Sequence, residues 1–170
     1  EKINENFGLK LSIINEFYNE SGYIDALSRL IKRNLPGDFD YLLFSYHGIP
    51  KRQNVRTNPS YEDQVKISSK LCAEKIGIPD DKWGVSFQSR IGPGWLEPFT
   101  DITLKELPKK GIKKIAVVCP SFVADNLETL EEINIEAREN FLESGGMEFQ
   151  YIPCLNDDDN WIEFLSEIAV

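Results

Sequence analysis

Residue 47 is the sole histidine of the chain, and it stands where an apolar run ends, in the segment SYHGIP (residues 45–50). Imidazole titrates near neutral pH and is the commonest metal ligand in proteins. Loops that follow a strand are a usual place for catalytic groups. From the pattern alone, a working role for His47 and a structural role in the turn around Gly48 and Pro50 are equally favoured.

A row of carboxylates is the second candidate. Glu128, Glu132 and Glu136 recur every four residues in a segment with helical periodicity. On an α-helix they would form a single file with about 6 Å between steps, which could relay a cation. The apolar residues of the segment form the opposite stripe, so spacing alone favours a solvated face. We expect Asp125 to cap this helix, with Glu128 in its first turn.

The segment FQSRIGPGW (residues 87–95) is the third candidate. The guanidinium of Arg90 suits a carboxylate, and Trp95 offers a flat apolar surface. A surface Arg beside a buried Trp is an equally good interpretation. The glycines do not fit a dinucleotide or ATP motif, and neither HExxH nor paired cysteines occur, so the sequence indicates no nucleotide or conventional zinc site.

Five strand-like segments alternate with five helix-like ones. The expected strands cover residues 9–17, 39–46, 83–87, 112–119 and 147–152, and the expected helices cover 25–34, 61–76, 96–107, 125–144 and 159–168. This order predicts one domain (residues 1–170) of the α/β class, a three-layer Rossmann-like fold whose parallel sheet of four or five strands is flanked by helices. We expect Pro98 in the first turn of its helix.

In such a sheet, ligands bind beyond the carboxyl ends of the strands. The loops expected at this edge are residues 16–18, 46–48, 88–90, 121–123 and 153–156. His47 and the start of the acidic helix therefore come to the same edge by topology alone.

Composition limits the partners. The chain has 19 basic and 28 acidic residues, a formal charge of −9. This charge argues against a nucleic-acid partner. No apolar run reaches the roughly 20 residues that span a bilayer, and no leader is evident, so we expect a soluble cytoplasmic protein, with peripheral membrane contact left open. Cys72, Cys119 and Cys154 show no CxxC spacing and are expected to be reduced, buried thiols.

Four motifs together go beyond these single signals. They are LFSYHGIP (43–50), FQSRIGP (87–93) followed by Trp95-Leu96 and Pro98, FVADNLETL (122–130) and PCLN (153–156). In these motifs, and in their order over residues 9–170, the chain resembles the C-terminal half of ferrochelatase, the enzyme that inserts ferrous iron into protoporphyrin IX in the terminal step of haem biosynthesis.

The resemblance implies a two-lobed enzyme that holds porphyrin between similar Rossmann-like halves. The N-terminal lobe would be the missing partner of this chain, and without it we expect the chain to be inactive. The residue matching His47 is a proton acceptor, a metal ligand or both, and the one matching Glu128 pairs with it. The residues matching Glu132 and Glu136 carry metal or protons, which replaces the solvated-face interpretation.

The expected substrate contacts follow from the same motifs. Trp95 and Ser89 match residues that line the porphyrin pocket, and Tyr46, Arg90 and Asp125 are further candidates. Fe²⁺ is expected as a substrate. No iron–sulfur cluster is expected, because three scattered cysteines cannot supply the four ligands of the [2Fe–2S] cluster found in some members.

The chain departs from the family pattern in two places. Asn126 stands where some members have His, so that histidine is not an essential part of the family mechanism. Residues 57–61 read TNPSY instead of the usual Gly-Asp-Pro-Tyr, which leaves the contacts of that loop open. Two alternatives remain at this point: a cobalt or nickel tetrapyrrole chelatase, and an isolated metal- or haem-binding module.

Overall fold

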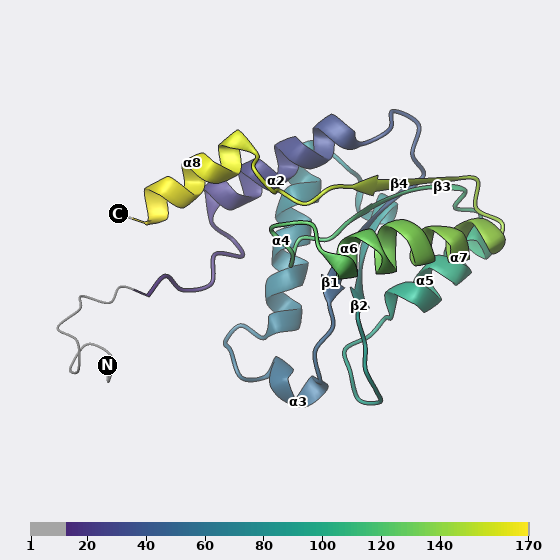
Figure 1. Ribbon diagram of the computed structural model, residues 1–170, viewed down its shortest axis with the longest axis horizontal. Coiled ribbons are helices and arrows are strands. Elements are labelled where there is room, and N and C mark those ends of the chain that lie inside the picture. The colour runs from purple at the N-terminus through teal and green to yellow at the C-terminus, as the bar shows by residue number, and fades with distance from the viewer. Residues whose placement is uncertain (1–12, 170) are drawn as a thin grey trace.

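A four-stranded parallel sheet forms the centre of the computed structural model, which describes residues 13–169 (Figure 1). Its strands are β1 (Tyr41–His47), β2 (Trp83–Gln88), β3 (Lys114–Val118) and β4 (Glu148–Ile152), in the spatial order β2-β1-β3-β4. All three neighbouring pairs are parallel. The predicted α/β class with a parallel sheet of four or five strands is confirmed.

Helices cover both faces of this sheet (Figure 1). They are α2 (Ser21–Asn34), α3 (Lys51–Asn54), α4 (Tyr61–Ile76), α5 (Thr100–Glu106), α6 (Leu127–Leu130), α7 (Arg138–Glu143) and α8 (Asp159–Ile168), with 3₁₀ turns η1 (Asp80–Lys82) and η2 (Leu107–Lys110) and the π-helix η3 (Glu132–Ala137). Helices α2, α4 and α8 pack on one face, and α5, η3 and α7 on the other. Among the described residues, no helix is long and apolar enough to cross a membrane.

Strand β1 is buried from Leu42 to Tyr46, as expected of a strand covered on both sides. Its side chains alternate between the two faces. Phe44 and Tyr46 belong to the core beneath α2 and α4, whereas Leu43 belongs to the core beneath α5 and η3. Because successive residues point to opposite faces, His47 lies on the α5 and η3 side.

Helix α4 has the bounds that the sequence predicts, because both ends carry local signals. The side chain of Ser60 accepts the Asp63 amide at the start, and Gly77 ends the helix with a φ of 85°. Only glycine adopts this left-handed conformation without a steric penalty.

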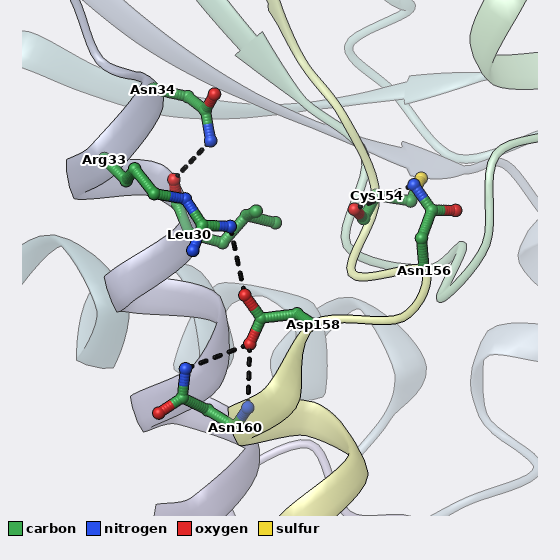
Figure 2. Close-up of polar contacts among 7 residues, drawn as sticks. All are labelled: Leu30, Arg33, Asn34, Cys154, Asn156, Asp158 and Asn160. Carbon is green, nitrogen blue, oxygen red and sulfur yellow. Dashed lines mark hydrogen bonds and ion pairs between the residues drawn. The ribbon is translucent and has the colours of Figure 1, made fainter.

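Helix α8 also has its predicted bounds and is fastened to α2 by a charged pair (Figure 2). The Asp158 carboxylate caps α8 by accepting the Asn160 amide (3.0 Å), and it also accepts an Arg33 N–H (3.0 Å). The rings of Trp161 and Phe164 complete the contact within the core.

The predicted strand 9–17 is wrong over residues 13–17, which form no strand, and residues 9–12 lie outside the described part. Phe17 instead packs its ring against Tyr23, with ring centroids 5.3 Å apart. The apolar character of this segment therefore reflects packing against the core, not a place in the sheet. Residues 16–18 accordingly do not follow a strand within the described chain.

The predicted helix 96–107 begins only at Thr100. Before it, the chain runs along the sheet edge: the Leu96 amide donates to the Ile49 carbonyl (3.0 Å), and the Phe87 amide donates to the Pro98 carbonyl (2.8 Å). Pro98 therefore does not lie in a helical turn. Pairing with β2 and the loop after β1 replaces the helical bonds of this segment.

The predicted helix 125–144 is broken into α6, η3 and α7. Its cap is Asn126, whose side chain forms a reciprocal capping box with Thr129. The expectation that Asp125 caps this helix is therefore wrong. In the π-helix the Glu136 amide reaches the Glu131 carbonyl (3.0 Å), five residues back.

Candidate active site at the carboxyl edge of the sheet

The backbone of His47 is held on both sides at the end of β1. Its amide donates to the Ser121 hydroxyl (2.7 Å), and its carbonyl accepts the Tyr61 hydroxyl (3.0 Å). His47 also pairs in register with Gln88 of β2. A loop residue, the first residue of α4 and the last residue of β2 thus fix the direction in which the imidazole leaves the strand.

The imidazole of His47 stands edge-on to the Phe122 ring, with ring centroids 5.8 Å apart. Its Nδ1 atom is buried and has no hydrogen-bond partner among the residues that the structure describes. Most buried polar atoms in proteins have a hydrogen-bond partner, and an unpaired one is explained by a bound water or ion, by strain or by a catalytic role. An imidazole in this state can accept a proton or bind a metal ion.

The side chain of Gln88 links strand β1, which ends at His47, to helix α6, which carries Glu128. Its side chain is 2 % exposed. The amide nitrogen donates to the main-chain carbonyl of Glu128 (2.7 Å), and the amide oxygen accepts the Ser45 hydroxyl (2.8 Å). The structure therefore brings the ends of β1 and β2 to the start of the acidic segment, as the topology predicts.

The three acids of the row have different surroundings. Glu128 and Glu136 are exposed, and Glu132 is half-buried. The carboxylate of Glu132 accepts both the amide (2.7 Å) and the hydroxyl (2.6 Å) of Ser89. Ser89 has a φ of 59°, an uncommon conformation for a residue other than glycine. Because Glu132 is already bound, the row has two free carboxylates rather than three equal ones.

A hollow of about 210 Å³ opens between β2, α5 and the π-helix. Ser89, Arg90, Glu132 and Glu136 are among its lining residues. The Arg90 guanidinium pairs with Asp101 (3.2 Å) and lies over the Phe99 ring, 4.3 Å from its centroid. Arg90 is thus engaged within this chain.

Trp95 lies beside the turn that follows His47. It forms an antiparallel bridge with Pro50, and a Cβ at Gly48 would lie 3.3 Å from its ring. Trp95 is half-buried, so part of its ring surface remains open at the same edge. This placement suits the predicted flat apolar contact.

Tyr46 does not line this edge. It is 3 % exposed, and its hydroxyl bonds to Ser69 of α4 (2.9 Å) on the face away from His47. Burial raises the pKa of Tyr46 well above its usual value. The prediction of Tyr46 as a substrate contact is contradicted by this geometry, because alternation along β1 turns Tyr46 and His47 to opposite faces.

Asp125 has a supporting position rather than an open one. Its carboxylate accepts the Tyr151 hydroxyl (2.5 Å), the Asn156 amide (2.8 Å) and the Cys154 main-chain N–H (3.2 Å). Burial alone would raise the pKa of Asp125, but these hydrogen bonds outweigh it and lower the pKa. With its oxygens occupied, Asp125 ties the loop after β4 to the loop after β3 and is not free for substrate.

Sequence reasoning did not single out Gln88, Ser45, Ser121 or Tyr61. Gln88 lies within a motif that the sequence highlighted, and the period of two along β1 places Ser45 on the face of His47. The contacts of Ser121 and Tyr61 join residues 74 and 14 positions away from His47. The topology places residues 121–123 at the edge of His47, but no local pattern indicates the individual contacts of Ser121 and Tyr61.

Comparison with known proteins gives the family. The protein-family model described as Ferrochelatase matches residues 1–170 of this chain. The chain belongs to the ferrochelatase family. Its relatives include ferrochelatases of Pseudomonas fluorescens strain Pf0-1 (41 % identity), Pseudomonas putida strain F1 (39 %) and Pseudomonas entomophila strain L48 (41 %), with 95 %, 95 % and 93 % of this chain covered. The chain spans about half the length of these relatives, 54–55 %.

The three cysteines of this ferrochelatase-family chain are free and buried. Burial raises the pKa of the Cys72 and Cys154 thiols to about 12, so both are protonated at neutral pH. The prediction of reduced, buried thiols is confirmed.

Proposed function

We propose that this chain is the C-terminal lobe of a ferrochelatase and that the native protein inserts Fe²⁺ into protoporphyrin IX. The observation that carries the proposal is the meeting of His47, with its unpartnered buried Nδ1, and the acidic segment at one sheet edge. The names of the relatives, each ferrochelatase, support the same reaction. Protoporphyrin and ferrous iron are the substrates, and the N-terminal lobe of the same protein is the partner across the cleft.

His47 is the proposed base. Insertion of a metal removes two pyrrole N–H protons, and a neutral imidazole can accept a proton. General-base catalysis typically contributes about 10²- to 10⁴-fold in rate. The edge-on Phe122 contacts the ring, and the hydrogen bonds of the His47 backbone to Ser121 and from Tyr61 hold the residue in position for this transfer.

The carboxylate of Glu128 is proposed to stabilise the imidazolium once His47 is protonated, and to share the incoming metal. Exposed Glu136 is proposed as a weaker site on the way in, since an ion held too tightly would not move on. Trp95 supplies apolar contact to the macrocycle. Contacts of this kind could hold the ring in a bent shape that exposes its nitrogens.

The test is His47→Ala in the native protein. We expect insertion to fall at least about 10²-fold, because the base is lost. Porphyrin binding, followed by the Soret band, should remain within about twofold, because one imidazole is small beside the apolar area of a whole macrocycle. Normal turnover in this variant would refute the assignment of His47.

Parallel assays separate the proposal from its alternatives. Formation of iron protoporphyrin but not of metallated sirohydrochlorin supports a ferrochelatase, and the reverse supports a cobalt or nickel chelatase. Binding of metal or haem with no metalloporphyrin formed by the native protein would indicate a binding module. We place the protein in the cytoplasm and expect no iron–sulfur cluster; iron and sulfide analysis of the purified native protein tests the latter.

A further inference from the structure

Four buried polar side chains form a continuous line beneath the site. Ser86 bonds to Thr100 (2.8 Å), Thr100 to Ser45 (2.9 Å) and Ser45 to Gln88 (2.8 Å). Each of the four is at most 2 % exposed. The line ends where the Gln88 amide meets the Glu128 carbonyl, 2.7 Å away.

The direction of every bond in this line follows from its last member. A main-chain carbonyl only accepts, so the Gln88 nitrogen must face Glu128. The Gln88 oxygen then faces Ser45, whose single hydroxyl proton is used there. The Thr100 hydroxyl must therefore donate to Ser45, and the Ser86 hydroxyl must donate to Thr100. All four groups donate in one direction, towards the acidic segment.

The acceptor at the end of the line lies at a break in the helix. Helix α6 ends at Leu130, and η3 begins at Glu132. The last four carbonyls of an α-helix lack partners within the helix, and Glu128 is one of them. Gln88 supplies that partner from 40 residues away, and the neighbouring Ser89 binds the Glu132 carboxylate. The consecutive residues Gln88 and Ser89 thus form hydrogen bonds to this segment on both sides of the break, at Glu128 and at Glu132.

Two members of the same line are neighbours of the histidine in the sheet. Ser45 lies two residues before His47 on the same face of β1, and Gln88 pairs with His47 in the β1–β2 register. We propose that Gln88 is a positioning residue that sets the register of the π-helical segment relative to His47, and with it the approach of Glu128 to the imidazole. This inference rests on the proposed function for its catalytic consequence, but not for its structural one.

Gln88→Met in the native protein tests the proposal, because Met keeps the volume and removes the side-chain hydrogen bonds to Ser45, Glu128 and Glu132. We expect kcat to fall about 10- to 100-fold, the range typical for loss of an orienting partner, with the porphyrin KM unchanged. The matched control is Ser86→Ala, which removes a buried hydroxyl at the far end of the line and should leave kcat within about twofold. Equal kcat losses in the two variants, or no loss in Gln88→Met, would overturn the proposal.

Amide hydrogen exchange gives a readout that does not depend on activity. We expect faster exchange over residues 131–137 in Gln88→Met and unchanged exchange there in Ser86→Ala. If the wild-type protein inserts no metal, the proposed function fails, and this exchange difference still decides the role of Gln88. Should Gln88→Met not fold, Ser45→Ala carries the test: it keeps Gln88 but frees its amide to rotate, so a smaller change of the same sign is expected, and its absence would count against the proposal.

Discussion

His47 and Glu132 are both candidate site residues in the sequence, but the fold gives them different surroundings. The Nδ1 of His47 is buried without a partner, whereas the Glu132 carboxylate accepts two bonds from Ser89. An unpaired buried polar atom destabilises the fold, whereas a carboxylate with its hydrogen bonds made contributes to stability. Of the evenly spaced acids, Glu128 and Glu136 therefore keep carboxylates without a hydrogen bond from the residues that the structure describes, whereas Glu132 holds the segment in place.

Glu136→Gln is expected to raise the metal KM about 3- to 10-fold, since one exposed charge contributes about 1 kcal/mol of attraction. The porphyrin KM should not change. Glu139→Gln removes the same charge from an exposed position outside the row and should leave both values within about twofold. Steady-state assays with metal and porphyrin varied separately measure this, and an unchanged metal KM in Glu136→Gln would return that residue to the solvated surface.

At the scale of elements, helix ends with local signals were predictable and interrupted helices were not. The two ends of α4 are set by its caps, Ser60 and Gly77, which lie directly next to the helix in the sequence. The break between α6 and η3 instead has its partners at the end of β2 and just after it, at Gln88 and Ser89. A helix follows its sequence pattern only until distant groups offer its backbone and side chains better partners.

Asp158→Ala is expected to lower the unfolding free energy by about 1 kcal/mol, the usual cost of a lost helix cap. Arg33→Ala should cost less, because its side chain is 61 % exposed and exposed ion pairs contribute about 0–1 kcal/mol. Urea denaturation of the native protein at neutral pH compares the two. A larger loss for Arg33→Ala would show that the ion pair, rather than the cap, fastens α8.

The same carboxylate has a predictable pH dependence. Burial would raise the pKa of Asp158, but hydrogen bonds from Asn160 and Arg33 outweigh it and lower the pKa below its usual 3.8. Its contribution is therefore complete above about pH 4 and is lost as the pH falls through the lowered pKa. The stability difference between wild type and Asp158→Ala should shrink below about pH 4. A difference that grows in acid would contradict this sign.

At the scale of the whole molecule, the sheet separates two apolar cores. One lies beneath α2, α4 and α8 and includes Ile31, and the other lies beneath α5, η3 and α7 and includes Ile133. Both isoleucines are at most 1 % exposed. The site lies at the edge where the strands between these cores end, so both cores fix its position.

Ile31→Val and Ile133→Val are each expected to cost about 0.5–1.5 kcal/mol of unfolding free energy. The double variant should lose the sum within about 0.5 kcal/mol, because side chains in separate clusters share no partners. Urea denaturation of the native protein measures all three. Coupling well beyond that margin would mean that the sheet transmits packing changes from one core to the other.

The sequence by itself determined the α/β class, the parallel strands, the bounds of α4 and α8, and the edge at which His47 and the acidic segment meet. Periodicity and capping depend on residues only a few positions apart, so the local sequence is enough to predict them. Only the tertiary structure decided the π-helical break, the non-helical course of residues 95–99, the turning of Tyr46 into the core and the hydrogen bonds that occupy the Asp125 carboxylate. Each of these depends on contacts with other elements, such as the hydrogen bond between Gln88 and Glu128, which are 40 residues apart. Such contacts stabilise the protein only once the sheet has assembled.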